Sequence, residues 1–221
     1  MNRRSAVAMA CFTALFLVLS GNDAAVFPQE ERGVIRLKSP QLFRGKKLMM
    51  ALKERRSSRS FDPKMLPNDV LSGLLWAGFG INRSDSGKRT APSAMNWQEI
   101  EIYVAMENGL YLYRPKESTL VPVLGKDIRK FVGMQEYVKE APISLIYVAD
   151  FEKMTGSEQD KIWLAACDAG FISQNVHLYC ASEELATVTV AWIDKPRLEK
   201  VMGLRKDQKV VIAQPVGYKK N

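Results

Sequence analysis

The stretch that decides the fold is DKIWLAACDAGFISQNVHLYCASEE, residues 160–184. Apolar and small residues fill much of it, and the pattern predicts one continuous helix of about 37 Å at the standard rise. A helix that is apolar on most of its sides is buried on most of its sides. We therefore expect 160–184 to form the central helix of the domain or the core of an interface.

The segments on either side of this helix carry both strand and helix patterns. Runs of β-forming residues predict strands over 99–106, 110–113, 142–149, 187–193 and 208–216. Helical spacing and cap residues predict helices over 48–56, 67–80 and 196–202. The Asn108-Gly109 pair predicts a tight turn between the first two strands. This order of elements predicts an α+β domain built on one sheet.

The overall charge is basic without being concentrated. The chain has 221 residues, 47% of them hydrophobic, and a net charge of +8 from 32 Lys and Arg against 24 Asp and Glu. This length is typical of one domain. The basic residues form no stripe or long run, so nucleic-acid binding is disfavoured, while an anionic membrane surface and an anionic cofactor both stay open as explanations of the charge.

The N-terminus has the pattern of a targeting segment. Arg3 and Arg4 precede an uncharged run over 6–19, which is short for a membrane span. We expect 1–25 to be a signal peptide, of a type that resembles a twin-arginine signal, and the protein to be exported to the periplasm with no membrane span left after cleavage. An uncleaved anchor is the alternative. An extended lead-in over 26–45 then precedes the domain at 46–221.

Cysteine and histidine usage narrows the chemistry. Cys167 and Cys180 lie thirteen positions apart in the predicted helix, about 20 Å along its axis, so they are expected to be buried thiols without a disulfide. His177 is the single histidine. One histidine excludes a Ser-His-Asp triad and His-rich zinc sites, and no metal site is predicted.

The stretch ERRSSRSF, residues 54–61, gathers three arginines among three serines. At a helix end it is either a solvated cationic face that complements the helix dipole or a phosphate cradle, because arginine forks and serine hydroxyls both bind phosphate oxygens. Spacing alone leaves both open. A P-loop is excluded, since six residues separate Gly80 from Gly87 and Arg89 follows Lys88.

A second polar stretch, TAPSAMNWQEI, covers residues 90–100. Its Ser93, Asn96 and Gln98 place hydroxyl and amide groups directly before a predicted strand. Such groups are found in ordinary capped loops, and they would also suit a flat heterocycle with donors and acceptors along its edge.

Several separate blocks carry a family resemblance: RRSSRSF, LLWAGFGINR, KRTAPSAMNWQEIEIYVA, DAGFISQNVHLYCASEELATV and VGY. In this order the chain resembles the nitroreductase superfamily, most closely its SagB/ThcOx-type branch, over 46–218. The resemblance implies a nitroreductase-like α+β fold, with a mostly antiparallel sheet flanked by helices. It also implies an intertwined homodimer with FMN at the interface.

The resemblance implies that FMN is held by residues from both subunits. The implied cofactor-binding residues are Arg55, Arg56, Ser57, Arg59, Pro92, Ser93, Ala94, Asn96, Thr189, Val190, Ala191 and Lys219. Arg59, and less directly Arg89, would stabilise the negative charge of the reduced flavin. Ser58 and Ser60 are expected to face elsewhere, and His177 is expected to be a packed interface histidine.

The implied activity is an FMN-dependent oxidoreductase that passes hydride or electrons to a small organic acceptor such as a quinone or nitro compound, or oxidises a small substrate. Two alternatives stay open: an exported flavin-binding dimer without turnover, and an azoline-type peptide dehydrogenase. The donor, NADH, NADPH or another, is not fixed by the sequence, and export would remove the protein from the main supply of nicotinamide donors.

Overall fold

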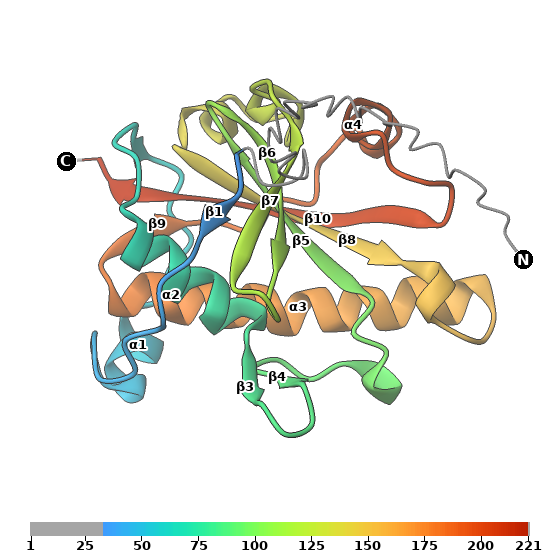
Figure 1. Ribbon diagram of the computed structural model, residues 1–221. Helices are drawn as coiled ribbons and strands as arrows, with labels where there is room; N and C mark the ends of the chain where they lie inside the picture. Colours follow the sequence, from blue (N-terminus) through green and yellow to red (C-terminus); the bar gives the residue numbers. More distant parts are fainter. Residues whose placement is uncertain (1–32, 221) are drawn as a thin grey trace, which may run out of the picture. The chain divides into compact units, whose positions relative to one another are not determined.

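The computed structural model describes residues 33–220, so the predicted signal peptide and the start of the lead-in lie outside the described residues. An antiparallel sheet runs through the domain (Figure 1). Its order is β1 (Ile35–Arg36), β7 (Thr119–Leu124), β6 (Gly109–Arg114), β5 (Ile100–Met106), β8 (Ile143–Asp150), β10 (Gln208–Lys219) and β2 (Phe61–Asp62), with β9 (Leu185–Thr187) also on β10. The predicted α+β class is confirmed.

Helices cover both faces of this sheet. They are α1 (Leu48–Glu54), α2 (Asn68–Phe79), α3 (Glu158–Ser182) and α4 (Lys195–Met202). In Figure 1, α3 lies along one face with α1 and α2 on the same side, and α4 lies on the other. Alternate residues of β5 enter different cores, Ile102 on the α2–α3 side and Tyr103 on the α4 side. The period of two along a strand therefore builds two apolar cores.

Helix α3 is buried along one face only. Ser157 caps its start, since the hydroxyl accepts a hydrogen bond from the Asp160 amide at 3.2 Å. Ile162, Trp163 and Phe171 are exposed, with Trp163 63% accessible. The expectation of burial on most sides is therefore not met within one chain. Ala165, Ile172 and Val176 pack in the core, while these three large apolar side chains stay exposed.

Two predicted boundaries are wrong for tertiary reasons. The helix expected over 48–56 ends at Glu54, and the following arginines lie in an extended segment whose Ser58 amide donates to the Thr187 carbonyl oxygen at 2.9 Å. Of the strand expected over 187–193, only Thr187 belongs to a strand, because β9 ends at that residue. Beyond it, Val190 makes a single bridge to Ala213.

Strand β7 was not expected, because Pro122 interrupts its apolar run; here the β6–β7 register shifts next to the Tyr111–Pro122 pair. The segment between the helix expected over 67–80 and the strand expected over 99–106 contains a hairpin of β3 (Ile81–Arg83) and β4 (Lys88–Arg89) and a 3-10 helix, Ala94–Asn96. The Asn108-Gly109 turn is confirmed, since Met106 pairs with Gly109.

Both cysteines of α3 are free, as expected. Cys180 is buried, whereas Cys167 is only half-buried, so the expected burial of both thiols is wrong for Cys167. Across residues 33–220, none of the helices combines the length and apolarity that a membrane crossing requires.

Candidate functional site

The extended segment after α1 forms one side of a basic pocket. Arg56 and Ser58 of this segment both line the pocket, together with Lys219 of β10. His177 and Thr187 line it from α3 and β9. We call this set the basic pocket: Arg56, Ser58, His177, Thr187 and Lys219. Two of the predicted cofactor residues, Arg56 and Lys219, thus come together although they are far apart in sequence.

His177 connects the basic pocket to Thr189. Its Nε2 atom lies 3.1 Å from the Thr189 hydroxyl, which lies 2.7 Å from the hydroxyl of Ser173. Burial, together with the positive charge of Arg55, lowers the pKa of His177 to about 4. The ring is therefore neutral near pH 7. Its buried Nδ1 has no hydrogen-bond partner among the described residues.

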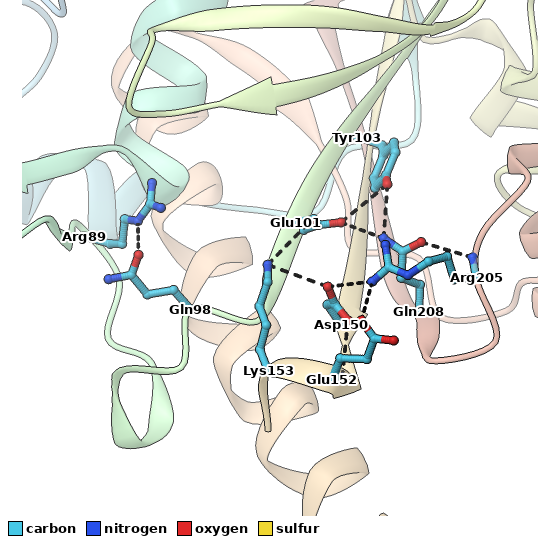
Figure 2. A network of polar contacts seen from close by, with 9 residues as sticks. All are labelled: Arg89, Gln98, Glu101, Tyr103, Asp150, Glu152, Lys153, Arg205 and Gln208. Atoms are coloured by element: carbon cyan, nitrogen blue, oxygen red, sulfur yellow. Dashed lines mark hydrogen bonds and ion pairs between the residues drawn. The ribbon is translucent and has the colours of Figure 1, made fainter. Parts of the chain in front are cut away.

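A second group of predicted residues lies around a cavity of about 360 Å³ beside the β3–β4 hairpin. We call it the polar loop, and its side chains are Arg89, Pro92, Ser93, Asn96 and Gln98. Figure 2 shows Arg89 pointing to Gln98, with Nε donating to Oε1 at 2.7 Å. The Arg89 guanidinium also lies 5.1 Å from the centre of the Phe79 ring, and burial lowers its pKa.

Two carboxyl groups that the sequence analysis did not identify accept hydrogen bonds from this loop. The Ala94 amide donates to Asp168 Oδ2 at 2.8 Å, and the Ser93 hydroxyl donates to Glu99 Oε2 at 3.1 Å. Burial, with the nearby charge of Asp168 as a smaller cause, raises the pKa of Glu99 to about 7. An aspartate in the middle of an apolar helix was the one signal in the sequence that could have indicated this contact.

The basic pocket and the polar loop are well separated within one chain. Asp168 contacts the polar loop and His177 lines the basic pocket, and nine positions along α3 correspond to about 14 Å. Of the other predicted residues, Ser57, Arg59 and Ala191 are exposed. Val190 is buried and its amide and carbonyl both bond to Ala213. Its neighbours Thr189 and Ala191 are thus better placed than Val190 for any ligand contact.

Comparison with known proteins assigns the family. A family model described as the nitroreductase family matches residues 52–218, which include both the basic pocket and the polar loop except for Lys219. The chain belongs to the nitroreductase family. A nitroreductase-type crystal structure from Ralstonia eutropha JMP134 is 37% identical, with a TM-score of 0.82 over 88% of this chain and 93% of that one.

One further relative and one further structure are similar to this chain. A nitroreductase-type protein of Methanocaldococcus jannaschii is 29% identical over 184 residues, covering 78% of this chain and 91% of its own. An NADPH:FMN oxidoreductase from Vibrio harveyi, solved with NAD+, shares the fold at 17% identity, with a TM-score of 0.60 over 79% of this chain and 69% of its own. Membership makes this protein, in general terms, a flavin-dependent oxidoreductase.

Proposed function

We propose that the protein is an FMN-dependent oxidoreductase of the nitroreductase family that passes hydride from a reduced donor to a small organic acceptor such as a quinone or nitro compound. The observation that carries the proposal is the pair of part-sites on one chain. One is cationic and suits a phosphate, and the other offers amide and hydroxyl groups that suit the edge of a polar ring.

The residues of the basic pocket fit an FMN phosphate. Arg56 and Lys219 supply cations, Ser58 supplies a hydroxyl, and His177 Nδ1 is a buried polar atom without a partner among the described residues. Glu54 at the rim is neutralised by Lys46, whose Nζ lies 2.6 Å from its carboxylate. A dianionic phosphate would therefore meet a net positive site.

The polar loop fits the ring of the flavin. Ser93 and Asn96 line its cavity with groups that hydrogen-bond to a heterocycle edge. Bound FMN would supply the hydride chemistry, while the chain binds and orients it. Arg89 is already engaged with Gln98 and Phe79, so we assign it to holding the loop. Arg59 is exposed and stays the proposed cation for the reduced ring.

We also propose that the working unit is a homodimer. The separation of about 14 Å along α3 is comparable to the length of FMN from its phosphate to the edge of its ring, so the case for a dimer rests on the exposed surface of α3. The exposed apolar side chains of α3, Ile162, Trp163 and Phe171, offer a surface that a second copy would cover. Each flavin would then take its phosphate grip from one subunit and its ring contacts from the other.

Turnover tests the proposed function. The purified protein is reconstituted with FMN, reduced with NADH or NADPH, and mixed with a quinone or a nitroaromatic. Rapid reoxidation of the flavin by the acceptor supports the enzyme. A flavin that binds but is not reoxidised by either acceptor supports the alternative of a flavin-binding dimer without turnover. Oxidation of an azoline-containing peptide in their place would favour the SagB/ThcOx-type alternative.

We retain export as a proposal from the N-terminal sequence. It predicts a periplasmic protein that lacks its first 25 or so residues, and a donor other than free cytoplasmic NAD(P)H. Cell fractionation followed by N-terminal sequencing decides the matter. A cytoplasmic protein with Met1 or Asn2 at its N-terminus would contradict export.

A further inference from the structure

Two buried carboxyl groups beneath the polar loop have no role in the proposed function. Glu99 precedes β5 and is fully buried, and Asp168 comes from the middle of α3 and is 3% exposed. The two carboxyl groups are close enough for the negative charge of Asp168 to raise the pKa of Glu99. Among the described residues, Glu99 Oε1 has no hydrogen-bond partner when the carboxyl is ionised. One proton held between the two groups gives this oxygen a partner and removes the repulsion of two buried charges.

Both carboxyl groups reach the same short segment. Asp168 accepts from the Ala94 amide and Glu99 accepts from the Ser93 hydroxyl, while that hydroxyl accepts from the Gln98 amide at 2.8 Å. Between these contacts the backbone is left-handed at three residues that are not glycine: Met95 (φ 49°), Asn96 (φ 56°) and Gln98 (φ 49°). Such conformations persist only where the surroundings fix them.

We propose that Glu99 and Asp168 share one proton and thereby fix the 93–98 segment of the polar loop, which makes them positioning residues for the ring side of the site. The use of the loop for a flavin ring rests on the proposed function. The fixing of the loop does not, because every contact that carries it lies within the described chain.

The other ionisable groups around this pair are engaged elsewhere. Arg89 on β4 points to Gln98, and Asp150 on β8 points to Arg205 with the carboxylate and guanidinium 2.9 Å apart (Figure 2). Lys161 on α3 donates to a backbone carbonyl oxygen at 3.1 Å. Asp168 is thus the charged neighbour that acts on Glu99, and together with burial it keeps Glu99 protonated up to about pH 7.

The consequence is a loop that loosens as the pH rises. When the loop opens, water reaches Glu99 and its pKa returns from about 7 toward the ordinary 4.5. The opening equilibrium should therefore increase about tenfold per pH unit between these values and level off above them. Opening breaks the bond from the Ala94 amide to Asp168, so that amide reports the change.

Residue-resolved hydrogen exchange on the purified full chain measures this opening, with protection expressed relative to the free-peptide rate at each pH. The protection of the Ala94 amide should fall roughly fortyfold between pH 5 and 7. The Phe131 amide, bonded to the Ile128 carbonyl oxygen at 2.9 Å, serves as the internal reference and should not follow it.

Conservative variants separate the shared proton from mere packing. Glu99→Gln keeps an acceptor for Ser93 and places a permanent N–H where the proton would be, so its Ala94 protection should not change with pH. Glu101→Gln is the matched control: Glu101 lies two residues along the same strand and faces Lys153 and Gln208 (Figure 2). It should behave as wild type.

A flat profile for wild-type Ala94, or a fall in Glu99→Gln as large as in wild type, would overturn the proposal. If Glu99→Gln does not fold, the wild-type profile decides alone. The same samples are titrated with FMN. If the protection of Ala94 changes with pH but the protein does not bind FMN, this inference stands and the proposed function is refuted. If the protein binds FMN but the protection of Ala94 does not change with pH, the proposed function stands and this inference is refuted.

Discussion

Glu99 and His177, two of the buried titratable groups, should give the folding stability opposite dependences on pH. The pKa of Glu99 is raised from 4.5 to about 7 and that of His177 is lowered from 6.5 to about 4. Each displacement of roughly 2.5 units corresponds to about 3 kcal/mol. The contribution of Glu99 is present below pH 4.5 and is lost as the pH rises to 7. That of His177 is present above pH 6.5 and is lost as the pH falls to 4.

Because the two displacements are nearly mirror images, they largely cancel in the wild type, and single variants reveal them. Urea unfolding is measured from pH 4 to 8 for wild type, Glu99→Gln and His177→Gln. Wild type minus Glu99→Gln should decrease by about 3 kcal/mol between pH 4.5 and 7, and wild type minus His177→Gln should increase by a similar amount between pH 4 and 6.5. Taking differences removes the contribution of the other carboxylates. Differences that stay constant with pH, or that slope the other way, would refute the reasoning.

Three further predictions concern binding, assembly and packing. Arg56→Ala combined with Lys219→Ala should weaken FMN binding at least tenfold, since charge-assisted hydrogen bonds contribute about 1.5–3 kcal/mol each. Fluorescence titration measures the affinity, and an unchanged affinity would show that the basic pocket does not bind FMN. Trp163→Glu should convert the dimer to a monomer in sedimentation analysis, because it places a negative charge among the exposed apolar side chains of α3. An unaltered dimer would place the interface elsewhere. Leu74→Ala removes a fully buried side chain of α2 and should cost about 2–5 kcal/mol in urea unfolding, whereas a loss below 1 kcal/mol would contradict the packing described.

Elements with local signals could be predicted from the sequence. Helix α2 begins directly after Pro67 and ends before Gly80, and α4 starts at an Asp194 side chain that accepts from the Arg197 amide. In contrast, the arginine segment looked helical because its residues favour helix. It is extended because Ser58 bonds to Thr187, more than a hundred positions away.

The candidate site shows the same division. The side chains around the polar loop come from one short stretch of sequence and could be listed together. The basic pocket differs from the expectation, because Ser58, expected to face elsewhere, lines it with Thr187, whereas Ser57 is exposed. The pairing of Glu99 with Asp168 could not be predicted, since it joins a strand end to the middle of a helix 69 positions later. The composition of α3 also could not show that its own chain buries only one face of the helix. An apolar helix has the same sequence pattern whether its own chain or a second copy covers it.

The central claim is that each flavin is held by the basic pocket of one subunit and the polar loop of the other, and subunit mixing tests it most directly. Arg56→Ala with Lys219→Ala disables the first part-site, and Ser93→Ala with Asn96→Gly disables the second. Equal amounts of the two variants, unfolded and refolded together, should bind about one FMN per four chains, because half of the random dimers regain one intact site. Each variant refolded alone should bind almost none. A mixture that binds no more FMN than the separate variants would contradict the shared site.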